Sequence, residues 1–219
     1  MDTYKTIVQF FQDGGFFMYP IMLVLAVGLA IAVERWIYLS LARGRNRRVW
    51  KQVEPMIRAG NLRQAQELVG NSRTALARIL SYGLARVSTA RRREEVEMAM
   101  EEGLMEIIPR LERRTPYLAT FANLATLLGL LGTIIGLIDA FTAVAEANPA
   151  EKATLLSSSI SVAMNTTAFG LMAGIPLLLL HAWLQSRTTE VVDSLEMATV
   201  RLLNALGTRT DKVAQQAAA

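Results

Sequence analysis

Three apolar segments, each long enough to cross a lipid bilayer, constrain the fold of this chain more than any other feature. They occupy residues 16–41, 116–145 and 154–186, and a spanning helix needs roughly 20 predominantly apolar residues. Because backbone polar groups cannot stay unpaired in lipid, such segments form helices. The sequence therefore predicts an all-α membrane protein with three transmembrane helices.

The basic residues predict how these helices are oriented. Arg43, Arg45 and Arg47 follow the first apolar segment, and cytoplasmic flanks of spanning helices are enriched in Lys and Arg. We expect the N-terminus outside, the C-terminus in the cytoplasm and long cytoplasmic helical extensions. The expected order is a periplasmic segment (1–15), a first transmembrane helix (16–41), a cytoplasmic helical region (42–115), a second transmembrane helix (116–145), a periplasmic turn (146–153), a third transmembrane helix (154–186) and a cytoplasmic C-terminal helix (187–219).

Local signals predict several helix ends and packing faces. Asn61 can cap a short helix after Gly60, and Pro116 opens the second transmembrane helix. The sequence also leaves open a longer second helix that extends back through Pro109 into the cytoplasm, because membrane helices tolerate proline. Glu34 and Arg35 are expected to form an interfacial ion pair with a snorkelling Arg. Apolar periodicity predicts buried faces in two charged helices, at Val96, Met100, Leu104, Ile107, Ile108 and Leu111, and at Val191, Leu195, Leu202 and Leu206.

Composition argues against enzyme chemistry and against bound cofactors. The chain has no Cys and one His, so thiolate sites, histidine metal clusters and catalytic triads are not expected. We predict no metal, no cofactor and no enzyme activity. The basic region from Arg43 to Arg114 is read as an orientation signal that contacts membrane lipids, or as a protein docking surface. Interleaved acids and the lack of stacking aromatic residues argue against nucleic acid.

Small residues follow one side of the second apolar segment and recur in the third. Helices in lipid associate by close backbone approach through such residues, so Gly129, Gly132, Gly136 and Gly170 are expected to serve helix packing, together with Pro176. The two stripes either pack together tightly or leave a narrow groove for a third helix. We expect them to be the surface by which subunits assemble. The stripe of the second segment consists of Ala122, Thr126, Gly129, Thr133, Gly136 and Ala140.

Four polar residues within the spans are candidates for an ion pathway. They are Thr133, Asn165, Thr166 and Thr167, and intramembrane polar groups often mark such pathways. Hydrogen bonds between helices, or to a carbonyl one turn earlier, explain threonines equally well, and for Thr133 and Thr167 both readings stay open.

Titratable groups are absent from the centre of the predicted spans. Asp139 is expected near the outer boundary, as an interfacial acid or an ion access point. His181 is expected near the inner boundary, in a hydrogen bond or a headgroup contact rather than a proton relay. A proton carrier would therefore have to come from another polypeptide.

Three sequence blocks resemble the MotA/TolQ/ExbB proton-channel family, and specifically its three-helix ExbB and TolQ branch. They read FFMYPIMLVLAVGLAIAVERWIYL from Phe16, LGLLGTIIGLIDAF from Leu128 and SVAMNTTAFGLMAGIP from Ser161. Their order, and the long insert after the first helix, extend the resemblance over nearly the whole chain.

The resemblance implies a homopentameric stator in the bacterial inner membrane that surrounds a dimer of an ExbD- or TolR-like single-helix partner. Proton-motive force would move this partner through an aspartate on its helix, and a TonB- or TolA-like protein could receive the work. Thr133 and Thr167 match the pore-lining threonines of the family. Val162 stands where ExbB proteins often carry glutamate. The alternative is a non-conducting oligomeric membrane scaffold.

Overall fold

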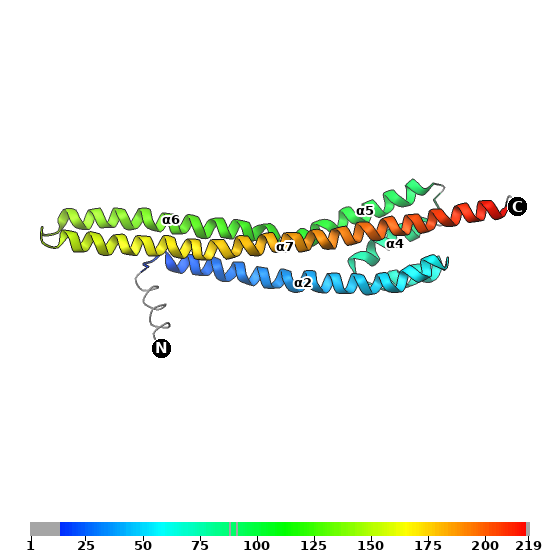
Figure 1. Cartoon of the computed structure of the whole chain (residues 1–219), viewed down its shortest axis with the longest axis horizontal. Coiled ribbons are helices and arrows are strands. Elements are labelled where there is room, and N and C mark those ends of the chain that lie inside the picture. Colours follow the sequence, from blue (N-terminus) through cyan, green and yellow to red (C-terminus); the bar gives the residue numbers. More distant parts are fainter. Residues whose placement is uncertain (1–13, 88, 91, 218–219) are drawn as a thin grey trace, which may run out of the picture. The chain divides into compact units, whose positions relative to one another are not determined.

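The described part of the chain consists of helices and short connections between them. A computed structural model describes residues 14–87, 89–90 and 92–217, and these residues contain no strand. Three helices are long and apolar enough to span a membrane, which confirms the all-α fold. Most of the expected N-terminal segment 1–15 lies outside the described residues. The helices are α2 (Met18–Arg58), α3 (Leu62–Gly70), α4 (Ala75–Val87), α5 (Arg93–Glu112), α6 (Thr115–Glu146) and α7 (Lys152–Ala217), labelled in Figure 1.

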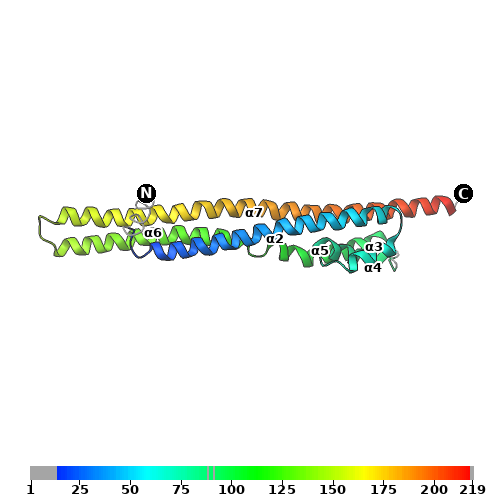
Figure 2. The ribbon, with the colours of Figure 1, turned by 90° about the horizontal axis from the view of Figure 1, so that it is seen from below.

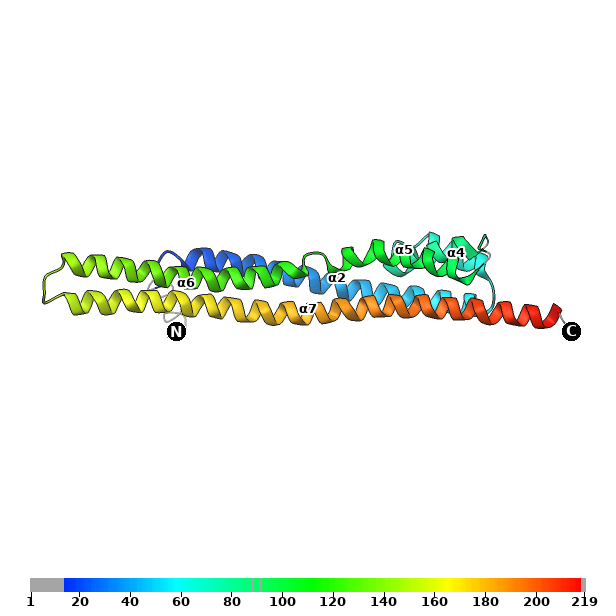
Figure 3. The same cartoon turned by 90° about the horizontal axis from the view of Figure 1, so that it is seen from above.

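The chain divides into two units, to each of which α2 and α7 contribute. The first unit comprises residues 1–34 and 114–184, and the second comprises residues 35–113 and 185–219. In the first unit, α6 and α7 run side by side and antiparallel, as Figure 2 and Figure 3 both show. This unit holds most of each of the three apolar segments.

The start of α2 packs against the α6–α7 pair in the first unit. Met18 and Ile21 of α2 are buried together with Ala125 of α6 and with Phe169 and Ala173 of α7. The small side chains of Ala125 and Ala173 leave room for the larger ones between them. This contact covers one side of the α6–α7 pair.

A second apolar core joins α3, α4 and α5 to the remaining parts of α2 and α7. Val53 of α2, Leu80 of α4, Met100 of α5 and Leu195 of α7 are fully buried in it. Eight residues of the predicted faces of α5 and α7 are buried in this core, so their periodicity was read correctly. Ile108 and Leu206 are only partly buried at its margin.

Helices begin close to the residues that the sequence signals predicted, but not always with the predicted capping bonds. Pro116 lies in the first turn of α6, and α7 continues through Pro176, as predicted. Asn61 precedes α3 but makes no side-chain capping bond. α5 continues through Pro109 but ends at Glu112, and Arg114 adopts a left-handed conformation with φ of 71°, so α5 and α6 do not form one continuous helix.

The expected ion pair between Glu34 and Arg35 is not formed. Neighbouring residues point to different sides of a helix. Glu34 instead lies 3.3 Å from the guanidinium of Arg114 in the first unit. Within the second unit Arg35 is 3% exposed, donates a hydrogen bond to the Leu111 carbonyl and lies over the ring of Tyr38. A cation at the carbonyl end of α5 is favourable, because this end of a helix carries partial negative charge.

The backbones of α6 and α7 approach each other most closely at paired glycines. A Cβ added to Gly170 would lie 2.8 Å from the Ala125 carbonyl oxygen and 2.9 Å from the Gly129 Cα. A Cβ on Gly136 would lie 3.0 Å from the Ala163 Cβ. The stripes therefore pack tightly against each other within one chain, which is the first of the two arrangements that the sequence left open. Pro176 lies on the exposed side of α7 and takes no part in this contact.

Replacing Gly170 by alanine is expected to destabilise the chain. The added methyl group would meet backbone atoms of α6, and overpacking of this kind costs about 1–3 kcal/mol. Thermal unfolding in detergent, followed by Trp fluorescence, should show a lower midpoint. Gly44→Ala is the matched control, because no atom lies within 4 Å of its added Cβ. An unchanged midpoint for Gly170→Ala would contradict the close approach.

Candidate functional site in the apolar helices

A pair of threonine hydroxyls bridges α6 and α7 next to the glycine contact. The Oγ1 atoms of Thr133 and Thr167 are 2.8 Å apart. Thr167 also lies 2.9 Å from the Gly129 carbonyl, and Thr133 lies 2.8 Å from the Leu130 carbonyl. Both side chains are half-buried. The two residues thus hold the helices together through side-chain hydrogen bonds.

The hydrogen bonds of this pair can run in either direction. Each hydroxyl has one proton to donate and lone pairs to accept with. Thr133 can donate to Thr167 while Thr167 donates to Gly129, or Thr167 can donate to Thr133 while Thr133 donates to Leu130. Each arrangement makes the bond between the two hydroxyls and one carbonyl bond, to Gly129 in the first case and to Leu130 in the second. The pair therefore forms a short hydroxyl chain whose polarity can reverse without movement of either helix.

The threonine pair lies at one edge of the contact between α6 and α7. At 100° per residue, the glycine stripe flanks each threonine on one side, and exposed apolar residues flank it on the other. Because the helices are antiparallel, the two exposed flanks lie on the same side of the contact. The hydroxyls therefore border a common apolar surface, formed by Leu130 and Leu137 of α6 and by Met164 and Leu171 of α7.

Thr166 occupies the opposite side of the same contact. Its hydroxyl donates to the carbonyl of Gly14 at 2.6 Å, and its side chain is 2% exposed. Its methyl group meets the position of a Cβ at Gly132, where Phe17 also lies nearby. The structure thus places Thr166 in the interior, under the chain segment that leads into α2. It does not share a surface with Thr133 and Thr167, contrary to the expected grouping.

The remaining polar residues of the spans are not brought to the threonine pair. Asn165 is half-buried and lies about 200° around α7 from Thr167, which is nearly the opposite face. Asp139 is exposed and lies about 240° around α6 from Thr133. His181 is half-buried, fourteen residues beyond Thr167 along α7. Helical geometry alone separates these residues from the hydroxyl pair.

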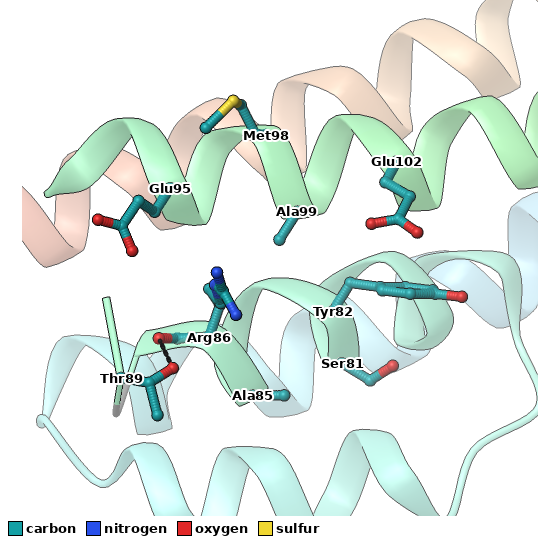
Figure 4. Close-up of a pocket in the computed structure, with 9 residues that line it drawn as sticks. All are labelled: Ser81, Tyr82, Ala85, Arg86, Thr89, Glu95, Met98, Ala99 and Glu102. Carbon is teal, nitrogen blue, oxygen red and sulfur yellow. Dashed lines mark hydrogen bonds between the residues drawn. The ribbon is translucent and has the colours of Figure 1, made fainter. Parts of the chain in front are cut away.

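The second unit carries a groove between α4 and α5, shown in Figure 4. It has a volume of about 650 Å³, and Arg86 of α4 points into it between Glu95 and Glu102 of α5. At one end Tyr82 donates a hydrogen bond to the Glu106 carboxylate at 3.1 Å, and this bond raises the pKa of Tyr82. Opposite charges of α4 and α5 therefore face each other across the groove.

These features define a multi-pass helical membrane protein whose spans associate through glycines and hydroxyls. The model of the MotA/TolQ/ExbB proton channel family matches residues 71–197, which is more than half of the chain. The chain therefore belongs to the MotA/TolQ/ExbB proton channel family, and the resemblance of the three blocks is confirmed.

Individual relatives agree with this assignment. The chain is 29% identical to an ExbB homolog of Methanothermobacter thermautotrophicus, over 89% of this chain and 68% of the relative. It is 31% identical to an ExbB-like biopolymer transport protein of Synechocystis, over 84% of this chain and 72% of the relative. It is 36% identical to the Tol-Pal system protein TolQ of Haemophilus influenzae, over 42% of this chain and 40% of the relative.

Removing the hydroxyl of Thr166 is expected to destabilise the start of α2. In Thr166→Val the buried Gly14 carbonyl loses its donor, and an unsatisfied buried group costs about 1–3 kcal/mol. Hydrogen exchange should become faster in the first turn of α2, while Thr166→Ser, which keeps the hydroxyl, should stay close to the parent chain. Equal exchange in all three proteins would show that this bond contributes nothing.

Proposed function

We propose that this chain is the stator subunit of a motor driven by proton-motive force in the bacterial inner membrane. In this proposal a homopentamer surrounds a dimer of an ExbD- or TolR-like single-helix partner. The work would serve an envelope process such as TonB-type uptake or a Tol-type system. Membership of the proton channel family, and relatives named ExbB and TolQ, support this reading.

The threonine pair is the observation that carries the proposal. Thr133 and Thr167 present two hydroxyls in an otherwise apolar surface. The opposite side of the α6–α7 contact is closed by the start of α2 through Met18 and Ile21. A foreign helix can therefore reach the hydroxyls from one side only. In a ring of subunits, that side would line the central space.

In the proposed mechanism the protons travel on an aspartate of the partner helix. Each subunit supplies the Thr133–Thr167 hydroxyl pair, which can accept a hydrogen bond from a neutral carboxyl group or donate one to a carboxylate. The charged and neutral forms of the aspartate would then prefer different contacts, which is the minimum that a switch requires. One charge that crosses 100 mV releases roughly 2.3 kcal/mol, enough to bias discrete steps.

The proposed proton pathway depends more on the hydroxyl pair in this protein because the side chain at position 162 is apolar. Val162 is half-buried one turn before Thr166, and its backbone carbonyl lies 3.0 Å from the Thr166 hydroxyl. Valine cannot bind a proton, so this position adds no second carrier to the pathway. The proposal therefore assigns proton exchange to the two hydroxyls and the partner.

Loss of either hydroxyl is expected to abolish energised activity while assembly is kept. Thr133→Val and Thr167→Val keep the shape of the side chain and remove its hydrogen bonds, so proton flux in liposomes that contain the purified complex should fall at least about 100-fold, as for loss of a proton-transfer group. Thr126→Val is the control, since among the described residues its hydroxyl bonds only to the Ala122 carbonyl one turn earlier. Full flux in both test variants would remove these residues from the pathway.

A direct test of the proposed function is the isolation of the partner. We expect a protein with one transmembrane helix and a mid-membrane aspartate to copurify with the chain. Proton flux of the complex should disappear when this aspartate is replaced by asparagine. A chain that purifies without such a partner and conducts no protons would be the scaffold that the sequence left as the alternative.

A further inference from the structure

Two oppositely charged surfaces of the second unit have no ion-pair partner in the part of the chain that the structure describes. The basic surface consists of Arg45, Arg48 and Lys51 on α2. The acidic surface consists of Glu94, Glu97 and Glu101 on α5. All six side chains are exposed, and none forms an ion pair with another described residue.

Some neighbouring charges of the same unit are compensated within the chain. Arg43 of α2 pairs with Glu190 of α7 at 2.8 Å. Glu106, on the groove side of α5, pairs with Arg78 at 3.0 Å and with Arg110 at 2.8 Å. These pairs neutralise charges that lie between helices of the same chain. The acidic and basic surfaces point away from those helices.

The acidic surface borders two exposed apolar side chains. Met98 and Met105 are 60% and 73% exposed, and their spacing of seven residues places them on one face of α5. In Figure 4 Met98 points away from α4. An apolar centre with a charged rim is the usual composition of a protein interface. This face of α5 therefore has the composition of a docking surface.

The two surfaces lie at the same height along the second unit. The hydrogen bond from Arg35 to the Leu111 carbonyl fixes a common level for α2 and α5. Arg48 lies thirteen residues after Arg35, and Glu97 lies fourteen before Leu111, which at 1.5 Å per residue puts both about 20 Å from that level. The same calculation gives nearly equal heights for two further pairs, Arg45 with Glu101 and Lys51 with Glu94.

Equal height is what a ring of identical subunits requires. Rotation about the ring axis moves each residue sideways and leaves its height unchanged. A contact between two different surfaces of one chain closes into a ring when the rotation closes. In the view of Figure 1 α4 lies between α2 and α5 in this unit, so the two surfaces belong to separate helices, and each subunit can offer one of them to each neighbour.

We propose that the acidic surface of α5 docks onto the basic surface of α2 in the next copy of this chain. The inference rests on the proposed ring of identical subunits and adds to it the pair of surfaces that sets subunit order. Exposed ion pairs contribute little affinity each, but they orient partners and exclude wrong ones. Met98 and Met105 supply the apolar contact, and the charges fix its register.

Cysteine cross-linking of the full chain tests this interface, because the chain has no Cys of its own. Two differently tagged copies, one Arg48→Cys and the other Glu97→Cys, are expressed together and oxidised in membranes. A disulfide between the two tags is expected. Arg48→Cys with Glu112→Cys is the matched control, since Glu112 is also exposed on α5 but lies about 20 Å from the height of Glu97. This control pair should stay unlinked.

A charge reversal provides a second readout. With Arg45→Cys and Glu101→Cys as the reporter pair, adding Glu97→Lys should lower the cross-linking yield about two- to fivefold, as for loss of one exposed ion pair. Adding Arg48→Glu to the other copy should restore the yield. A yield that ignores both changes would overturn the electrostatic register.

Native mass spectrometry separates failure of this inference from failure of the proposed function. A ring that stays intact without an Arg48–Glu97 cross-link would overturn the interface and leave the motor proposal standing. A cross-link from Glu97→Cys to Met197→Cys of α7 would likewise overturn it, by assigning another surface to α5. A chain that is monomeric with the partner present would overturn both.

Discussion

The close approach of α6 and α7 is the contact on which the rest of the first unit depends. Lipid offers little hydrophobic drive for helices to associate, so backbone proximity and hydrogen bonds must hold them together. Gly129 and Gly170 allow this proximity. Only at such a short separation can two threonine side chains on facing helices bond to each other. The packing of the glycines therefore creates the hydroxyl pair as well as the helix contact.

The two sides of this contact have different roles because the start of α2 covers only one of them. On the covered side Thr166 is buried and bonds to Gly14. On the open side Thr133 and Thr167 border exposed apolar residues. Similar residue types thus serve stability in one place and, in our proposal, proton transfer in the other. The second unit shows a comparable division, between charges that face the chain's own helices and charges that face outward.

The fold could be predicted from sequence because it depends on lengths and periodicities. Predominantly apolar segments longer than the bilayer thickness must be helical spans, and the faces of α5 and α7 follow from apolar spacing. The candidate site was predicted only in part. Asn165, Thr166 and Thr167 are adjacent in sequence, so composition treats them alike, but each step around a helix turns by 100°. Glu34 and Arg35 were misread for the same reason, because adjacent charges on a helix face different neighbours.

The sequence by itself determined that this protein has three helical spans, small-residue packing stripes and no titratable group of its own at their centre. These properties belong to single helices and need no knowledge of their neighbours. Tertiary structure alone decided that the stripes meet within one chain, that Thr133 pairs with Thr167 and that Thr166 is buried. The reason is that pairing depends on the rotation and height of one helix against another, and no local pattern encodes either quantity.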